Sequence, residues 1–246
     1  MLSHVTFTGW DDRTNIGDLG LLCRDQRPAS IEIAVLLSLD RVGEDRYPGI
    51  ESATEILRTA KYAGQRIAVH ACGRAARELL LHHTLGPELR PLLEAAERVQ
   101  VNVPETLWDD ARPRYRFAHE LAAAIERPVI VQVRDPEGWP ERVEGVQYLF
   151  DRSAGRGQVA EQVPPLTTFS VGYAGGLGPD NAHTFLDKLR PMSRVQPIAP
   201  IAPIWIDMKN GIRETSPRTK MDIPPWSYVS VTKCAQVMDA VRWALM

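Results

Sequence analysis

The chain has few cysteines, no long apolar run and no surplus of charge of either sign. Its three cysteines, Cys23, Cys72 and Cys234, stand far apart in 246 residues. A structural zinc site needs closely spaced ligands, so this spacing excludes one, and we expect no bound metal. Scattered thiols in odd number are typical of reduced cysteines, which predicts a cytoplasmic protein.

Segments that direct a chain into a membrane are also lacking. Residues 1–5 contain neither the basic nor the apolar region of a signal peptide. No apolar run approaches the roughly 20 residues that a membrane-spanning helix needs. The 29 basic and 31 acidic residues give a net charge of −2, whereas nucleic-acid-binding surfaces carry a basic excess. We therefore expect a soluble protein that binds neither membrane nor nucleic acid.

What the sequence does contain is a regular series of short apolar runs. Eight of them recur roughly every 28 residues, a spacing that fits one strand and one helix per repeat. The predicted strands are 5–8, 31–37, 67–71, 99–103, 129–133, 147–150, 168–173 and 204–208. The predicted helices are 15–22, 53–60, 74–83, 87–98, 115–125, 179–189 and 234–245.

This pattern predicts an α/β protein with a (β/α)8 TIM barrel that forms a single domain over residues 1–246. The chain length is close to the value of about 250 residues that is typical of that fold. A doubly wound open sheet is the main alternative, but eight strands without a break in composition favour the barrel. The sequence gives no indication of the oligomeric state.

Active sites of such barrels lie at the C-terminal ends of the strands, so the residues that follow each apolar run are candidates. These residues are Thr8, Arg41 or Arg46, His70, Cys72, Asn102, Arg134, Asp151, Gly175, Gly176, Asp207 and Lys209. The set contains carboxylates, cations, a thiol and an imidazole, which are the groups that acid–base chemistry uses.

Two glycine clusters favour a phosphate site. Gly155 and Gly157 follow the sixth strand, and Gly175 and Gly176 follow the seventh. Glycines at strand ends let backbone N–H groups approach a phosphate closely, because no Cβ atoms stand in the way. Their alternative role is to make tight turns.

The loop after the eighth strand adds the pair Asn210 and Gly211. TIM barrels often bind phosphate with the loops that follow strands seven and eight. The sequence therefore predicts a small phosphorylated substrate as the partner of this protein.

The candidate acids and bases each have a structural alternative. Asp151 ends the sixth strand, where it is either a general acid or a cap for loop amides. Asp207 has the same two roles, and alternation along the strand turns Asp207 and Lys209 in one direction. His70 is either a hydrogen-bonded structural residue or a base. Cys72 is either a small buried side chain or an activated thiol.

One rival motif is a dinucleotide pattern. Gly155-Arg-Gly157-Gln-Val-Ala160 matches G-x-G-x-x-A after a strand. A dinucleotide site needs a helix of several turns at this point, whereas Pro164 and Pro165 would end it almost at once. We therefore expect no nicotinamide cofactor, and no cofactor of another kind.

Several loops carry the motifs of one enzyme family. Ala174-Gly-Gly-Leu-Gly-Pro-Asp-Asn181 matches the motif Ala-Gly-Gly-Leu-x-Pro-x-Asn, and residues 150–153 match a Leu-Asp-Ser-like motif. Residues 207–214 are similar to Asp-x-Ser-Ser-Gly-Val-Glu, and Arg46-Tyr47 to an Arg-Tyr segment. With these motifs the chain resembles phosphoribosylanthranilate isomerase, a (β/α)8 enzyme of tryptophan biosynthesis.

The resemblance implies an Amadori-type rearrangement of an aminoaldose to an aminoketose, with Asp151 as the general acid. The family's base is a cysteine on the first strand, and Thr8 occupies that position here. A hydroxyl is far less acidic than a thiol and does not replace it at neutral pH. Cys72 and His70 are therefore the candidates for a replacement base.

The same resemblance places Arg46, Asp207 and Lys209 beside the substrate, and Lys209 adds a cation where the family has a serine. Two other functions stay open. In one, Lys209 forms a Schiff base, as in aldolases, although the charge of Asp207 opposes this by favouring the protonated lysine. In the other, the barrel binds a phosphorylated ligand without turning it over.

Overall fold

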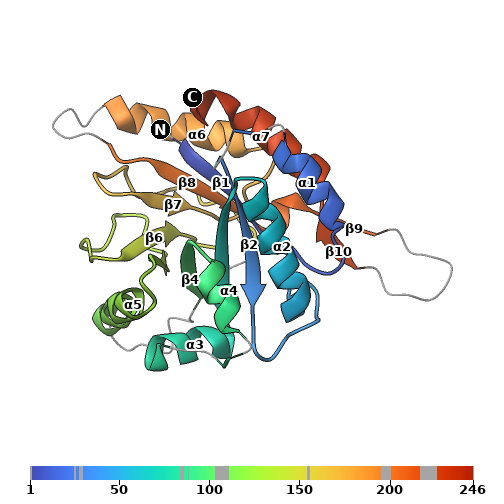
Figure 1. Ribbon diagram of the computed structural model, residues 1–246. Coiled ribbons are helices and arrows are strands. Elements are labelled where there is room, and N and C mark those ends of the chain that lie inside the picture. The colour runs from blue at the N-terminus through green and yellow to red at the C-terminus, as the bar shows by residue number, and fades with distance from the viewer. Residues whose placement is uncertain are drawn as a thin grey trace.

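The computed structural model is a closed barrel of eight parallel strands surrounded by helices (Figure 1). The structure describes residues 2–24, 26–27, 30–83, 86–87, 89–102, 111–153, 156–194, 201–216 and 226–245. The strands are β1 (Leu2–Thr8), β2 (Ile31–Leu37), β3 (Arg66–Cys72), β4 (Arg98–Asn102), β5 (Val129–Val133), β6 (Val146–Phe150), β7 (Val171–Tyr173) and β8 (Ile204–Met208). Each strand pairs with its sequence neighbour, and β8 pairs with β1. The predicted TIM barrel is confirmed.

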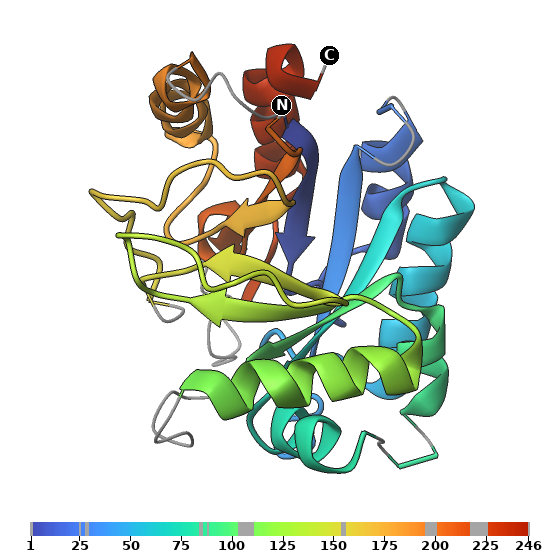
Figure 2. The same cartoon turned by 90° about the vertical axis from the view of Figure 1, so that its left-hand side faces the viewer.

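Helices cover most of the outer face of the barrel. They are α1 (Ile16–Arg24), α2 (Ile50–Tyr62), α3 (Gly73–His82), α4 (Arg90–Ala95), α5 (Ala111–Ile125), α6 (Ala182–Arg194) and α7 (Val231–Leu245). In the described residues no helix follows β5 or β6, and long loops connect these strands to the next ones (Figure 2). No helix in the described part of the chain combines the length and apolar character that a bilayer crossing requires.

Aromatic side chains pack over the side that these loops cover. The ring centroids of Tyr148 and Phe169 are 6.0 Å apart, and those of Trp139 and Tyr173 are 5.6 Å apart. Both pairs meet edge to face, the arrangement that ring quadrupoles favour. Trp139 Nε1 also donates a hydrogen bond to the carbonyl of Pro165 at 2.7 Å, which ties the two loops together.

Some element boundaries differ from the sequence predictions. The helix predicted over 87–98 is the shorter α4, and Arg98 instead begins β4, because its side chain is held inside the barrel. The predicted strand 168–173 is reduced to β7. The helix predicted over 179–189 is assigned from Ala182, after a turn in which Asn181 Oδ1 accepts a hydrogen bond from the Gly178 amide at 2.9 Å.

The chain after β8 forms three short elements that the sequence did not indicate. They are the 3-10 turn η2 (Asn210–Ile212) and the antiparallel strands β9 (Arg213–Thr215) and β10 (Ser227–Val229). α6 continues past Pro191 to Arg194, and residues 195–200 lie outside the described part.

The interior of the barrel is charged near the N-terminal ends of the strands. Arg98, which is 2% exposed, donates hydrogen bonds from Nε and Nη2 to the two carboxylate oxygens of Glu32 at 2.6 and 2.5 Å. Nη1 donates to Gln147 at 3.1 Å, and Nη2 lies 2.8 Å from His4 Nε2. Burial opposes ionisation of Glu32, but the charge and hydrogen bonds of Arg98 outweigh it and lower the pKa of Glu32 to about 2.

An apolar layer separates this ion pair from the C-terminal mouth of the barrel. Trp205, Ile130 and Leu149 form the layer, and Arg98 Cζ lies 4.2 Å from the centroid of the Trp205 ring. Gly172 on β7 makes room for the indole, because a Cβ there would lie 2.2 Å from Trp205 Cε2. The residues above this layer therefore stand on a closely packed base.

Candidate active site

A polar cavity opens at the C-terminal ends of the strands, where the sequence places the site. Ten of the predicted site residues line it: Thr8, His70, Asn102, Asp151, Gly157, Gly175, Gly176, Asp207, Lys209 and Asn210. The enclosed volume is about 50 Å³, which is the space of one or two water molecules. A larger ligand must therefore extend outward through the mouth.

Thr8 and Asp207 form a buried, hydrogen-bonded pair in the cavity. Thr8 Oγ1 donates a hydrogen bond to Asp207 Oδ1 at 2.7 Å, and both residues are buried. Burial raises the pKa of Asp207 to about 7, and the negative charges of Glu32 and Asp151 add to this effect. The hydrogen bond from Thr8 and the charge of Lys209 act in the opposite direction.

Asp151 is held by its own loop. Its Oδ1 accepts hydrogen bonds from the amide and the hydroxyl of Ser153 at 3.0 and 2.7 Å. Oδ2 accepts none from the described residues. Gly175 lies against the same carboxylate, because a Cβ there would be 3.2 Å from Asp151 Oδ1. Asp151 thus caps the loop with one oxygen and lines the cavity with its carboxyl group.

His70 and Gln100 are register partners on β3 and β4, and both line the cavity. His70 Nε2 and Gln100 Oε1 are buried and have no hydrogen-bond partner in the described residues. Burial lowers the pKa of His70 to about 3, so its imidazole is neutral at pH 7 and a weak base. The sequence did not single out Gln100 as a candidate, because a glutamine inside a strand carries no signal of its own.

Cys72 is the last residue of β3 and is not among the residues that line the cavity. Its thiol lies 3.6 Å from the His70 carbonyl and accepts a hydrogen bond from Asn102 Nδ2 at 3.4 Å. Burial raises the pKa of Cys72 above its usual value, which disfavours the thiolate.

Lys209 brings a positive charge to the cavity. It follows β8 directly, and it forms no ion pair or hydrogen bond with a side chain in the described part of the chain. Its charge lowers the pKa values of Asp207, His70 and Cys72, which places the ammonium near all three. This cation is therefore open to an anionic ligand.

Glycines allow the loops after β6, β7 and β8 to pack backbone against backbone. A Cβ on Gly176, whose φ is +66°, would lie 2.6 Å from the Val159 amide nitrogen. A Cβ on Gly211 would lie 2.1 Å from the carbonyl oxygen of Leu177. Close loop packing thus explains these glycines at least in part. Gly155, another predicted phosphate-binding residue, lies outside the described part of the chain.

Asn210 connects this glycine-rich side with the loop after β2. Arg46 Nη1 donates a hydrogen bond to Asn210 Oδ1 at 2.9 Å. A Cβ on Gly157, whose φ is +76°, would lie 2.9 Å from Asn210 Nδ2. The structure therefore brings three of the predicted binding residues, Arg46, Gly157 and Asn210, to one edge of the cavity.

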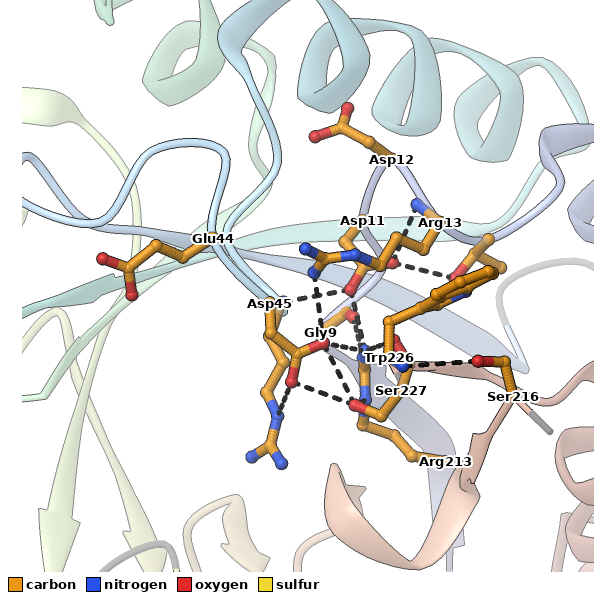
Figure 3. Close-up of polar contacts among 12 residues, drawn as sticks. Gly9, Asp11, Asp12, Arg13, Glu44, Asp45, Arg213, Ser216, Trp226 and Ser227 are labelled. Carbon is orange, nitrogen blue, oxygen red and sulfur yellow. Dashed lines mark hydrogen bonds and ion pairs between the residues drawn. The ribbon is translucent and has the colours of Figure 1, made fainter. Parts of the chain in front are cut away.

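Arg213 was not a predicted site residue, yet it fixes three loops beside the cavity (Figure 3). Its guanidinium donates to the Gly9 carbonyl at 2.6 Å, to Asp11 Oδ2 at 2.8 Å and to Ser227 Oγ at 2.9 Å. Asp45 accepts further hydrogen bonds from the same guanidinium and from Ser227. These contacts join the loops after β1 and β2 to the segment after β8.

No metal site accompanies these groups in the described residues, where no cluster of three or more histidine, cysteine or carboxylate side chains could hold an ion. The groups that line the cavity are thus two carboxyl groups, a cation and neutral hydrogen-bonding side chains.

By fold and by the position of this cavity, the protein is a (β/α)8 barrel protein. The sequence matches no protein-family model, and no curated protein matches it at a significant level. Its structure is similar to triosephosphate isomerase from Bartonella henselae, with a TM-score of 0.51 and 11% identity over 98% of this chain and 100% of that one. D-psicose 3-epimerase from Clostridium cellulolyticum H10 has a TM-score of 0.44 and 12% identity over 99% of both chains. At these identities the likeness shows the fold alone.

Proposed function

We propose that this barrel binds a small phosphorylated sugar and isomerises it between aldose and ketose forms by acid–base chemistry. The observation that carries the proposal is the meeting of Asp151, Asp207 and Lys209, which pairs with no side chain in the described part of the chain, in one cavity at the C-terminal mouth. The motif resemblance to phosphoribosylanthranilate isomerase supports the same reaction class. In the proposal, Asp151 supplies the acid through its uncapped oxygen.

The phosphate is bound beside β7 and β8 in this proposal. Gly175 and Gly176 both have positive φ, +98° and +66°, and their amides donate to no other described residue. Successive amides of this kind form a concave site for an anion, and Lys209 adds a full positive charge. Lys209 and the two amides therefore hold the phosphate, and Asn210 lines the same edge.

The test is turnover by the purified protein. Phosphoribosylanthranilate is followed by its fluorescence, and pentose and hexose phosphates are followed by NMR. We expect isomerisation of at least one of them, and Asp151→Asn should lower kcat by about 10²- to 10⁴-fold, the usual effect of losing a general acid. Absence of turnover on every substrate, with phosphate binding intact, would instead identify a non-catalytic binding barrel.

A Schiff-base reaction at Lys209 is a second candidate, favoured by one observation. A carboxylate beside a lysine opposes its deprotonation, but the pKa of Asp207 near 7 leaves that carboxyl about half protonated at neutral pH. Borohydride reduction in the presence of a carbonyl sugar phosphate should then attach the sugar to Lys209. Mass spectrometry without such an adduct rules this candidate out.

A further inference from the structure

We propose that Asp207, held in place by Thr8, is the proton-transfer partner of Asp151. The inference rests on the proposed isomerase function and names the group that takes the place of the cysteine base. In this arrangement Thr8 is a positioning residue, and Asp207 is the residue that exchanges a proton with the substrate.

The geometry of Asp207 suits this role. Oδ1 is occupied by the 2.7 Å hydrogen bond from Thr8, whereas Oδ2 accepts no hydrogen bond from the described residues. The residue lines the cavity together with Asp151 and Lys209. Trp205, two residues earlier on the same strand, is packed against Gly172 on the neighbouring strand. One carboxylate oxygen is thus fixed and the other is left for a ligand.

The other candidate bases are less suitable. His70 is a neutral imidazole with a pKa of about 3, and the Cys72 thiol has a raised pKa and does not line the cavity. Thr8 has a hydroxyl that donates to Asp207. Among these candidates, Asp207 is therefore the group suited to exchange protons near pH 7.

The charges that act on Asp207 come from several strands. Glu32 on β2 and, when it is ionised, Asp151 after β6 raise the pKa of Asp207, whereas Lys209 after β8 lowers it; His70 on β3 is neutral. Together with burial they keep the pKa of Asp207 at about 7. Near pH 7 a group with this pKa is present in both forms. The ionised form is an effective base, and the protonated form is an effective acid.

The proposed reaction balances without any further reagent. Asp207 Oδ2 removes the proton from C2 of the aldose, and the C–H electron pair forms the C1=C2 bond. Asp151, which enters the reaction protonated, gives its proton to the C1 carbonyl oxygen, which yields an enediol. Asp207 then returns its proton to C1, and the C2 hydroxyl returns a proton to Asp151 as the C2 carbonyl forms. Both carboxyl groups end in their starting states.

The first experiment compares the wild-type protein with Asp207→Asn, which has nearly the same shape. Turnover and the exchange of the C2 proton in D2O are measured by NMR on a substrate that the wild type isomerises. We expect both rates to fall by about 10²- to 10⁴-fold in Asp207→Asn. The exposed Asp239→Asn on α7 serves as the control and should keep the wild-type rates.

The second experiment tests the role of Thr8 through the pH profile of kcat/KM. The hydrogen bond from Thr8 lowers the pKa of Asp207, so Thr8→Val should move the acid limb of the profile to higher pH. Thr8→Ser keeps the hydroxyl and should restore the wild-type profile. A purely structural role of Thr8 would lower activity without moving this limb.

The outcomes separate the two proposals. If the wild type isomerises no sugar phosphate, the proposed function is wrong, and the role of Asp207 falls with it. If the wild type is active but Asp207→Asn keeps its turnover within a few-fold, only the role of Asp207 is wrong. If the acid limb of the pH profile does not move in Thr8→Val, the proposed role of Asp207 is also contradicted. This measurement can be made even if Asp207→Asn fails to fold.

Discussion

Two carboxyl groups inside the barrel, Glu32 and Asp207, differ in ionisation because their partners differ. Burial disfavours the charged form of both. Glu32 receives two hydrogen bonds from a guanidinium, and its pKa falls to about 2. Asp207 receives one hydrogen bond from a neutral hydroxyl, and its pKa rises to about 7. The first group stabilises the barrel as an ion pair, whereas the second is kept at a cost in stability.

That cost should be measurable through the pH dependence of stability. The pKa of Asp207 rises on folding from 3.8 to about 7, so the folded state binds the proton more tightly than the unfolded state. Stability is therefore lost as pH rises from about 4 to about 7, by up to about 4 kcal/mol. The asparagine side chain of Asp207→Asn would be neutral at all pH values. The substitution should therefore increase the free energy of unfolding, relative to the wild type, by more at pH 8 than at pH 4.

Urea denaturation of both proteins at the two pH values measures this difference. The exposed Asp239→Asn is the control and should change stability by the same small amount at both. Equal effects of Asp207→Asn at pH 4 and pH 8 would show that Asp207 titrates normally.

The sequence indicated most of the residues that line the cavity but not their protonation states. Asp151, Asp207 and Lys209 could be found because each directly follows or ends an apolar run, and the barrel brings such positions together. Arg98 could not, since a charged residue at a strand start looks like the end of the preceding helix. Its partner Glu32 stands in an otherwise apolar strand, and only the closed barrel shows that the two side chains meet.

At the scale of secondary-structure elements, the packing of β7 against β8 depends on one contact between a glycine and a tryptophan. Gly172 lies against the indole of Trp205, and the indole also covers the guanidinium of Arg98. The strands themselves were predictable, because buried parallel strands are nearly continuous apolar runs. The sequence analysis placed no helix after the fifth or the sixth strand, and the described residues have none there, but the aromatic side chains that cover the barrel instead were not predictable from that pattern.

We expect Gly172→Ala to destabilise the fold, because its Cβ would lie 2.2 Å from Trp205 Cε2. Overpacking of this kind costs about 1–3 kcal/mol. Combining it with Trp205→Leu, which removes the clashing ring, should give less than the sum of the two single effects. Gly20→Ala on α1 is the control, because an added Cβ there meets no atom within 4 Å and should be neutral or stabilising.

Chemical denaturation of the four variants decides the matter. If the changes in unfolding free energy of Gly172→Ala and Trp205→Leu are additive in the double variant, the glycine is not required to make room for the indole.

At the scale of the whole molecule, the cavity is built from loops that are anchored in different ways. Arg213 fixes the loops after β1 and β2 to the segment that follows β8. Glycine contacts pack the loop after β6 against that after β7, and the loop after β7 against that after β8. Lys209 lies between these two groups of loops, and a ligand that binds it would contact both. Ligand binding should therefore stabilise the entire barrel.

This linkage provides a test of the phosphate site that does not depend on turnover. A ligand that binds only the folded state adds about 2.7 kcal/mol at a concentration 100 times its Kd. We expect ribose 5-phosphate to raise the Tm in a concentration-dependent way, and free ribose to do so far less. Lys209→Met should remove most of the increase, because the phosphate loses its cation. Lys61→Met, an exposed lysine on α2, should keep it.

The salt dependence of the same measurement distinguishes the phosphate contact from general binding. A charge contact at an open cavity is screened by salt, with a Debye length of about 8 Å at 0.15 M and about 3 Å at 1 M. The stabilisation by ribose 5-phosphate should therefore fall as salt is added in the wild type, and depend little on salt in Lys209→Met. If the two proteins lose stabilisation in parallel, the phosphate is bound elsewhere, and the proposed place of the anion between β7 and β8 is wrong.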